Sequence, residues 1–401
     1  MKNITKEKQI ITTENKIILH PKDCKITCAK TVVETLISLG VTDIFGYPGA
    51  SVLSLYNELA DTKIRHILVR HEQAAVHMAE GYAKIKNKPG VVLVTSGPGF
   101  TNTVTGIANA YADSTPLIIL AGDVSTNSNG KTFQKTDMVS MTKACSKKIY
   151  SVSRKDDIKQ IIEEAYEVAN TGKKGPVIIT LPRNILESEY IHKHSKEIYK
   201  KKTPTLSELA CNKILRLLCN AKSPLLLLGG GATEAVDNIK KFAELTHIPV
   251  VSTLMGIGTY PSEKEDYLGM IGINGSYSAN TAINQADFIL ALGVSFSDRS
   301  TCKQQDFAKN SIIVSVNIEH NMNNSEIEII SDVDVFIQNL LSKIPSSKMP
   351  DLTEWNKHVQ LLKQECIKNI SSSDKLHSSF VLETIYKYTH KYEPVVVTDV
   401  G

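Results

Sequence analysis

The chain has 401 residues, of which 42% are hydrophobic and 22% charged, values ordinary for a globular protein of two or three domains. Its formal net charge of +4 is small for this length, and Lys and Glu are interspersed rather than gathered into a basic face. We therefore expect no nucleic-acid partner and no membrane partner, and no run approaches the roughly 18 apolar residues of a membrane span.

The seven cysteines are scattered and form no CxxC pair, so the sequence predicts neither a disulfide framework nor a metal site within this chain. This cysteine usage indicates a reducing compartment, and we expect a cytoplasmic protein. Residues 1–23 are rich in Lys and Thr and lack the apolar core of a signal peptide, so a flexible tail is expected there.

The predicted first domain, residues 24–189, alternates short β-branched apolar runs with longer amphipathic stretches. This alternation is typical of βαβ units and predicts an α/β fold, a parallel sheet with helices on both faces. The expected strands lie at residues 43–45, 67–69, 90–95, 116–121 and 176–181, and the expected helices at residues 29–39, 73–84, 101–112 and 157–170.

A Lys-rich stretch at residues 190–204 suits an exposed linker, and the alternation then begins again. The second α/β domain is expected at residues 205–345, with strands at residues 224–228, 248–252, 288–292 and 312–317.

Residues 346–375 are predicted to be a second linker that carries a helix at about residues 352–369. Residues 376–401 then offer a helix at residues 380–389 and a buried strand at residues 394–398. A parallel strand needs a crossover and a partner strand, so spacing leaves two interpretations equally open, of which one is the beginning of a third domain. The alternative is an edge strand added to the sheet of the second domain.

Three strand ends of the first domain carry features suited to a ligand. Glu72 follows the strand at residues 67–69, a Gly97-Pro98-Gly99 turn follows the strand at residues 90–95, and the turn at residues 46–49 follows the first strand. Each has an ordinary explanation, since helix starts favour carboxylates and glycine turns are common. Because ligands bind at the carboxyl ends of strands in open α/β sheets, their convergence predicts a crevice there.

Longer segments resemble one family. The segments FGYPGASVLSLYNEL, VRHEQAAVHMAEGYAK, PGVVLVTSGPGFTNTVTGIANAYADSTPLIILAG and KTFQKTDMVSMTK occur in this order, followed by PVVSTLMGIGTYP and LGMIGINGSYSANTAINQADFILALGVSFSDR. Together they resemble the acetolactate synthase (acetohydroxyacid synthase) large subunits, which are thiamin-diphosphate-dependent enzymes. The resemblance implies a pyrimidine-binding first domain, a Rossmann-like central domain of the FAD-binding type, and the beginning of a diphosphate-binding domain at residues 376–401.

The resemblance assigns roles in the first domain. It implies that Glu72 hydrogen-bonds N1′ of the aminopyrimidine ring, so that the 4′-imino nitrogen can take the thiazolium C2 proton. It implies that Gln134 orients the reacting groups and that Phe133 forms an apolar wall against the substrate. The remaining residues implied to line the pyrimidine pocket are Tyr47, Pro48, Gly49, Pro98, Gly99 and Asn102.

The resemblance also assigns roles in the second domain. Arg299 matches an arginine that can receive the carboxylate of the second oxo acid. Flavin contacts are implied for Gly229, Gly230, Gly231, Thr253, Leu254, Met255, Gly256, Gly293, Val294, Asp332 and Val333.

The sequence departs from the family pattern at both sites. In the first domain the departures are Ala50, which is unfavourable if its φ is positive, Phe100, which adds bulk beside the pocket, Asp123 in place of glutamine and Lys135 in place of glutamate. In the second domain a flavin-contacting histidine is replaced by Asn274 and a ribose-binding aspartate by Asn317. These changes weaken the expectation of bound FAD.

The resemblance implies carboligation of pyruvate with a second 2-oxo acid, giving acetolactate or acetohydroxybutyrate, by a transferase that works as a homodimer or tetramer. A regulatory subunit is a further candidate partner. The cofactors implied are thiamin diphosphate and Mg²⁺, with the Mg²⁺ ligands in a Gly-Asp-Gly…Asn motif downstream of Gly401. The chain is therefore expected to be C-terminally truncated and inactive alone. Two alternatives stay open: a flavin-free thiamin-diphosphate decarboxylase or acyltransferase, and a non-catalytic nucleotide-binding protein.

Overall fold

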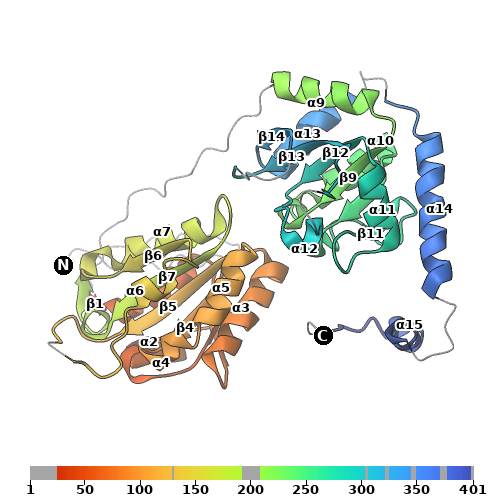
Figure 1. Ribbon diagram of the computed structural model, residues 1–401. Coiled ribbons are helices and arrows are strands. Elements are labelled where there is room, and N and C mark those ends of the chain that lie inside the picture. The colour runs from red at the N-terminus through yellow and green to blue at the C-terminus, as the bar shows by residue number, and fades with distance from the viewer. Residues whose placement is uncertain are drawn as a thin grey trace, which may run out of the picture. The chain divides into compact units, whose positions relative to one another are not determined.

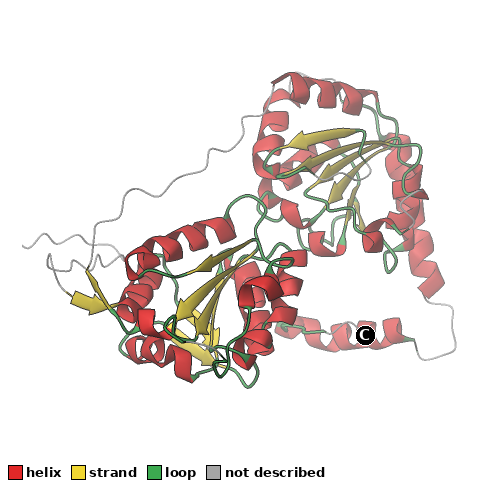
Figure 2. Ribbon diagram, turned by 60° about the vertical axis from the view of Figure 1, so that its left-hand side comes forward, coloured by secondary structure: helices red, strands yellow, loops and turns green. Residues whose placement is uncertain are grey.

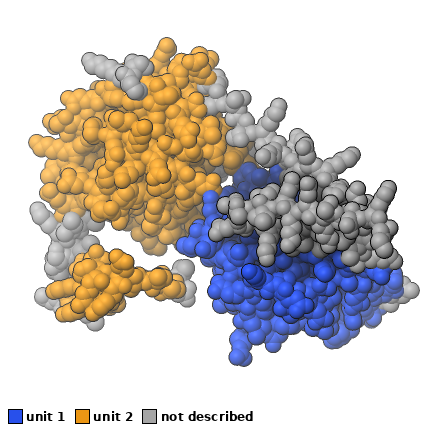
Figure 3. Space-filling model, turned by 180° about the vertical axis from the view of Figure 1, so that it is seen from behind, with its two compact units in different colours: residues 1–201 blue, residues 202–401 orange. Residues whose placement is uncertain are grey.

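The computed structural model describes residues 25–128, 131–191, 208–302, 306–320, 325–344, 349–370 and 377–398. It divides into two compact units, Met1–Lys201 and Lys202–Gly401 (Figure 3). Each unit is built on its own six-stranded sheet with helices packed against it, which confirms the predicted α/β fold class. The tail expected at residues 1–23 and most of the linker expected at residues 190–204 lie outside the described residues.

The sheet of the first unit is parallel throughout and has the strand order β3-β2-β4-β5-β7-β6 (Figure 1). Its central strands are continuous apolar runs buried along almost their whole length, as expected for a sheet covered on both faces. The strands are β2 (Asp43–Gly46), β3 (Arg65–Leu68), β4 (Gly90–Val94), β5 (Leu117–Asp123), β6 (Lys148–Ser151) and β7 (Pro176–Pro182).

Helices cover both faces of this sheet (Figure 2). One hydrophobic cluster joins it to α1 (Cys28–Ser38), α2 (Leu53–Ala60) and α7 (Ile158–Asn170). The other joins it to α3 (Glu72–Lys86), α5 (Val104–Ala112) and the short α6 (Met138–Thr142). The helix expected at residues 101–112 is divided, because α4 (Pro98–Thr101) ends before α5 begins.

Three strands of this unit were not predicted from the sequence. The edge strand β6 is short and only partly buried, so it lacks the apolar run that marks its neighbours. A separate antiparallel pair is formed by β1 (Lys25–Thr27) and β8 (Glu189–Ile191), and each of these strands has three residues. Segments this short carry too few side chains to show a period of two.

The second unit has a parallel sheet in the order β11-β10-β9-β12-β13-β14. Helices α9 (Glu208–Asn220), α10 (Val236–Thr246) and α13 (Val333–Lys343) share one core cluster with it, and α11 (Tyr277–Gln285) and α14 (Thr353–Ile370) share the other. The strands are β9 (Pro224–Leu228), β10 (Val250–Ser252), β11 (Tyr267–Met270), β12 (Phe288–Leu292), β13 (Ile312–Asn317) and β14 (Ile327–Ile330).

Helix α14 belongs to this unit rather than to a linker. It packs along α11, and Trp355 donates its indole N–H to the Pro224 carbonyl at 2.9 Å. The helix itself was predicted, at about residues 352–369, and Trp355, Val359 and Leu362 supply the apolar stripe that it buries.

The prediction of a buried strand at residues 394–398 is wrong. After α15 (Ser378–Thr389) the chain makes one 3-10 turn, and residues 393–398 are irregular and exposed, with Val395 at 92%. The alternative of an edge strand on the second sheet is also wrong, since β11 and β14 are its edges. An apolar run becomes a strand only where a neighbouring strand completes its hydrogen bonds, and none does so among the described residues.

Across the described residues, no helix combines the length and the apolar character needed to cross a lipid bilayer.

Candidate active site

The carboxyl ends of β3, β2 and β4 lie side by side, and Glu72 stands at this edge as the first residue of α3. Its side chain is buried although it carries a carboxyl group, with 9% of the residue exposed. Asn102 donates a hydrogen bond from Nδ2 to Oε2 of Glu72 at 2.9 Å, and within the described ranges no other side chain donates to this carboxylate. A buried carboxylate with one oxygen left to bond is costly in a purely structural position.

Glycines bring the backbone close to this acid. A Cβ atom on Gly99 would lie 2.6 Å from Thr95 Cγ2 and 3.4 Å from Glu72 Oε1, and one on Gly49 would lie 2.4 Å from Thr95 Cβ. Two turns predicted from separate strand ends therefore meet around one threonine next to Glu72. Close packing against Thr95 therefore requires glycine at both positions.

Two hydroxyl residues that the sequence analysis missed hold these turns together. Ser51 Oγ lies 2.8 Å from Thr95 Oγ1 and accepts a hydrogen bond from the Ser96 N–H at 3.1 Å. The available signal was modest: each is a small hydroxyl residue directly beside a glycine turn.

Tyr56 and His66 were also missed. The Tyr56 hydroxyl lies 3.2 Å from His66 Nε2, and the two rings meet edge to face with centroids 4.9 Å apart. Burial raises the pKa of the Tyr56 hydroxyl and the charge of Glu72 raises it further. Burial also lowers the pKa of His66, although a hydrogen bond with the Gly46 backbone opposes this. Both side chains therefore stay neutral at pH 7, beside a carboxylate.

The segment that carries Gln134 lies against the Gly97 turn. A Cβ on Gly97 would be only 2.8 Å from Gln134 Cβ, and both residues have positive φ, 65° and 61°. A non-glycine residue at positive φ is uncommon and points to a constrained loop. The neighbouring Phe133 is 86% exposed, so its ring contacts little within this unit.

A hollow of about 560 Å³ opens at the carboxyl ends of β5, β6 and β7, next to this loop. Asp123 and Lys135 both line it. Burial raises the pKa of the Asp123 carboxyl, while its hydrogen bond from the Val124 N–H and the charge of Lys135 oppose the rise. The two departures from the family pattern at these positions therefore place opposite charges on one hollow.

Two further departures have explanations different from those expected. Ala50 is not among the residues with positive φ, so it starts its 3-10 turn without backbone strain. Phe100 is fully buried in the cluster shared by α3, α5 and the sheet, so the expectation that it adds bulk beside the pocket is wrong. Because Phe100 lies in α4, its side chain turns into the core instead of toward the strand ends.

In the second unit the glycine turns meet between β9 and β12, where the direction of strand succession reverses. This is the position at which open α/β sheets bind dinucleotides. Cβ atoms on Gly229 and Gly231 would lie 2.2 Å and 2.9 Å from the Gly293 backbone, so close packing of two turns already requires glycine here. Their N–H groups donate to Leu292 and Gly293 carbonyls, and only Gly230 has an N–H that no backbone carbonyl in the described part accepts.

Other residues assigned to the flavin have structural partners of their own. Asp332 Oδ1 accepts from the N–H groups of Asp334 and Val335, which makes it the N-cap of α13. Val333 and Val294 are buried, and Thr253 donates its N–H to Leu228. Leu254 and Met255 differ, since they are 68% and 40% exposed and leave apolar surface beside the same strand ends.

Asn317, at the end of β13, donates from Nδ2 to the Val294 carbonyl at 3.1 Å. Its Oδ1 remains an acceptor, as a carboxylate would be, but without the charge. Arg299 lies in α12 (Asp298–Thr301), is exposed, and accepts from the Ile273 N–H through its carbonyl. It belongs to the second unit, whereas Glu72 and Gln134 belong to the first.

The residues around Glu72 fit the pyrimidine end of thiamin diphosphate, because they combine a buried carboxyl acceptor with side-chain-free turns. Within the described ranges, no group of three or more His, Cys, Asp or Glu side chains is arranged to hold a metal ion.

Comparison with known proteins agrees with this geometry. Residues 26–141 match the N-terminal TPP binding domain of thiamine pyrophosphate enzymes, and residues 211–340 match the central domain of the same enzymes. The chain is 35% identical to the acetolactate synthase large subunit of Haemophilus influenzae, over 94% of this chain and 69% of that protein. It is 36% identical to the Escherichia coli acetolactate synthase isozyme 3 large subunit, over 93% and 68%. For the Lactococcus lactis large subunit the identity is 39%, over 93% and 66%. The chain therefore belongs to the acetolactate synthase large-subunit family of thiamine pyrophosphate enzymes.

Proposed function

We propose that this protein condenses pyruvate with a second 2-oxo acid to form 2-acetolactate or 2-aceto-2-hydroxybutyrate, in branched-chain amino acid biosynthesis. The names of its relatives support the reaction, and the observation that carries it is the buried Glu72 carboxylate at the strand ends. The proposed cofactors are thiamin diphosphate and Mg²⁺.

Thiamin diphosphate, when bound, supplies the nucleophilic carbon that attacks the ketone of a 2-oxo acid and accepts the electrons released with CO₂. The protein's own contribution is to control the protonation of the aminopyrimidine ring. Glu72 would share a proton with N1′ of the aminopyrimidine through Oε1, because Asn102 already holds Oε2. Tyr56, kept neutral beside Glu72, adds no competing charge.

Roles toward the substrates are assigned to three residues, each considered by itself. Gln134, held in a constrained loop against the Gly97 turn, presents its amide to the reacting groups. Phe133 supplies an exposed apolar face, and Arg299 an exposed guanidinium suited to a carboxylate.

The reaction assignment is tested by Glu72→Gln in the intact enzyme, loaded with thiamin diphosphate and Mg²⁺. We expect turnover to fall about 10²- to 10⁴-fold, the usual contribution of a positioned acid or base, because the amide cannot exchange a proton with N1′. The matched control is Glu354→Gln, which makes the same change at an exposed acid in the first turn of α14 and should leave turnover unaltered. Turnover of Glu72→Gln within a few-fold of the parent would refute the assignment.

FAD is proposed as a further cofactor, bound in the second unit at the strand ends of β9 and β12, where the direction of strand succession reverses. The exposed Leu254 and Met255 could pack on a flat ring, and Gly230 offers a free N–H to a phosphate. The absorption spectrum of the purified protein decides this, since bound flavin is yellow. A colourless protein that also takes up no added FAD would favour a flavin-free member of the family.

A homodimer or tetramer, a regulatory subunit partner and a cytoplasmic location are proposed from the same relatives, which are named as large subunits. Light scattering on the purified protein measures the first of these. A monomer at micromolar concentration with cofactor bound would contradict it.

A further inference from the structure

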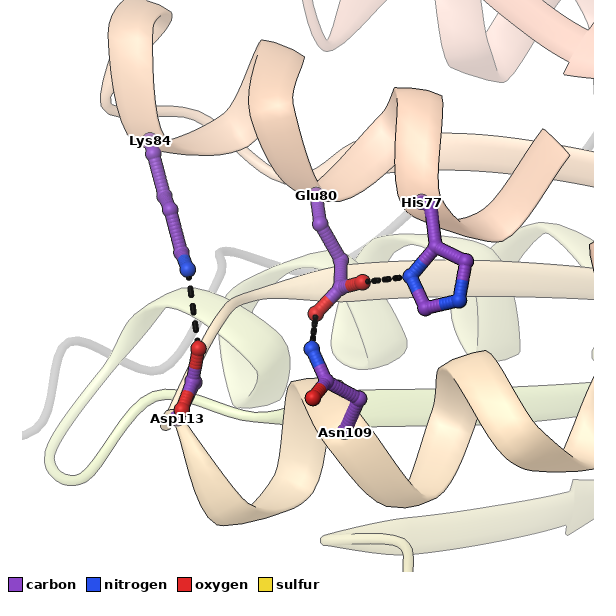
Figure 4. Close-up of polar contacts among 5 residues, drawn as sticks. All are labelled: His77, Glu80, Lys84, Asn109 and Asp113. Carbon is purple, nitrogen blue, oxygen red and sulfur yellow. Dashed lines mark hydrogen bonds and ion pairs between the residues drawn. The ribbon is translucent and has the colours of Figure 1, made fainter. Parts of the chain in front are cut away.

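Three polar contacts run along the seam between α3 and the α4–α5 segment. They join Glu72 to Asn102 at 2.9 Å, Glu80 to Asn109 at 2.8 Å, and Lys84 to Asp113 at 2.9 Å. We call these three pairs the α3–α5 ladder. Figure 4 shows its second and third contacts, with Glu80 and Lys84 of α3 reaching toward Asn109 and Asp113.

The middle contact is built differently from an ordinary surface pair. Only 4% of Glu80 is exposed, and both of its oxygens are bonded: Asn109 Nδ2 donates to Oε1, and His77 Nδ1 lies 2.6 Å from Oε2. A carboxylate oxygen can only accept, so His77 donates through Nδ1. A buried carboxylate costs free energy that an apolar residue would not, so simple packing does not explain it.

Small residues fill the space between the first two contacts. A Cβ on Gly106 of α5 would lie 2.6 Å from Val76 Cβ, and one on Gly90 of β4 would lie 2.3 Å from the Ala79 carbonyl oxygen. Such contacts bring α3 close to its neighbours. Hydrogen bonds add a directional constraint on the rotation of the helix about its axis, because they weaken steeply as the donor angle closes.

Glu80 lies on the same buried face of α3 as Glu72, eight residues further along. At about 1.5 Å per residue this is roughly 12 Å, or two helical turns. A contact fixed at that distance sets both the rotation and the axial position of the first turn of α3.

We propose that Glu80 is a positioning residue: by bonding Asn109 it fixes α3 against α5, so that the Glu72 carboxylate meets Asn102 through Oε2 and keeps Oε1 for the pyrimidine ring. This rests on the proposed function of Glu72. Glu80 touches neither cofactor nor substrate and acts only through the helix.

The experiment compares three variants of the loaded protein. Asn109→Asp sets a second carboxylate against Glu80 and removes its donor, and the two acids repel each other. The double variant Glu80→Gln with Asn109→Asp exchanges the two groups. The Gln side chain can donate to Asp and accept from His77, which restores every bond. Lys84→Met removes the third contact of the ladder, whose side chains are 45% and 29% exposed, and serves as the control.

Two readouts are used. One is the separation of kcat from KM, and the other is the circular-dichroism signal of the imino tautomer of the bound aminopyrimidine, which reports the proton at N1′ without turnover. We expect Asn109→Asp to lower kcat roughly 10- to 100-fold, as small misplacements of catalytic groups do, with KM for pyruvate nearly unchanged and the imino signal reduced. The double variant should recover both, and Lys84→Met should resemble the parent.

A fall in thermal stability without change in kcat or imino signal would overturn the proposal, as would failure of the double variant to recover. If Asn109→Asp does not fold, Glu80→Met replaces it, since it deletes the contact without burying a second charge. The same kcat loss is expected, and parental kcat would count against the proposal. Glu72→Gln distinguishes failure of the role proposed for Glu80 from failure of the proposed function. Full activity in the Glu72→Gln variant would contradict the proposed function itself.

Discussion

Glu72 and Gly99 illustrate how single residues define the candidate site. Glu72 supplies a buried acceptor, and Gly99 lets the backbone pack against Thr95 beside it, where any Cβ would clash. Both were predicted from their places after strands. Tyr56, Ser51 and Thr95 were not: Ser51 and Thr95 carry only the modest signal of a hydroxyl beside a glycine turn, and Tyr56 is not distinguished from a core residue by its local sequence.

The close packing at Gly99 is tested by the substitution Gly99→Ala. The new Cβ would lie 2.6 Å from Thr95 Cγ2, so we expect a loss of about 1–3 kcal/mol in unfolding free energy from overpacking, with weaker binding of thiamin diphosphate. Gly81→Ala on the exposed face of α3 is the control. Nothing lies within 4 Å of its Cβ position, and it should gain about 0.5–1 kcal/mol from helix propensity. Urea denaturation measures both, and equal effects would contradict the prediction.

Asp123 predicts a pH dependence. Its pKa is raised in the folded state, chiefly by burial, above the ordinary value of 3.8. Stability from this group is therefore complete below pH 3.8 and is lost as the pH rises through the folded pKa. Asp123→Asn keeps an acceptor for the Val124 N–H without the charge, so it should be more stable than the parent at pH 7. Denaturation at several pH values should show the difference vanish toward pH 4, and a constant difference would argue against it.

At the scale of elements, several residues that the resemblance assigns to the flavin lie at the ends of helices and strands and make hydrogen bonds there. Asp332 was assigned to flavin by resemblance, yet its carboxylate caps α13. Gly229 and Gly231 were also assigned to flavin contacts by resemblance, yet their N–H groups bond to backbone carbonyls. An element's own hydrogen bonds can thus account for residues that a motif attributes to a ligand.

Asp332→Ala is expected to destabilise the second unit by about 1 kcal/mol, the usual contribution of an N-cap, while Asp332→Asn should retain most of that stability. If the cap is its main role, FAD affinity changes little in either variant once the protein is folded. Thermal unfolding and FAD titration measure the two effects. A variant that keeps parental stability but loses FAD binding would reverse the interpretation.

At the scale of the whole molecule, each unit has its own sheet and its own pair of hydrophobic clusters. Among the described residues, each core cluster draws on one unit alone. Independent cores are the physical basis for independent folding.

We accordingly expect residues 1–201, produced alone, to unfold cooperatively with a far-ultraviolet spectrum typical of an α/β protein. The Glu72–Asn102 contact lies wholly inside this unit, so we expect Asn102→Ala to lower the stability of the isolated unit and of the full chain alike. Circular dichroism during urea denaturation makes the measurement. A non-cooperative transition would show that the first unit depends on the second.

The sequence by itself determined the α/β class, the long central strands and the place of Glu72 after a strand. Those properties follow from local apolar runs and from the residues that directly follow them. Tertiary structure decided what depends on distant partners. The run at residues 394–398 lacks a neighbouring strand among the described residues, Phe100 packs into a core, Asp123 and Lys135 share a hollow, and Glu80 bonds across to Asn109. Such outcomes depend on contacts between residues that are far apart in the sequence, and a local sequence pattern carries no information about those contacts.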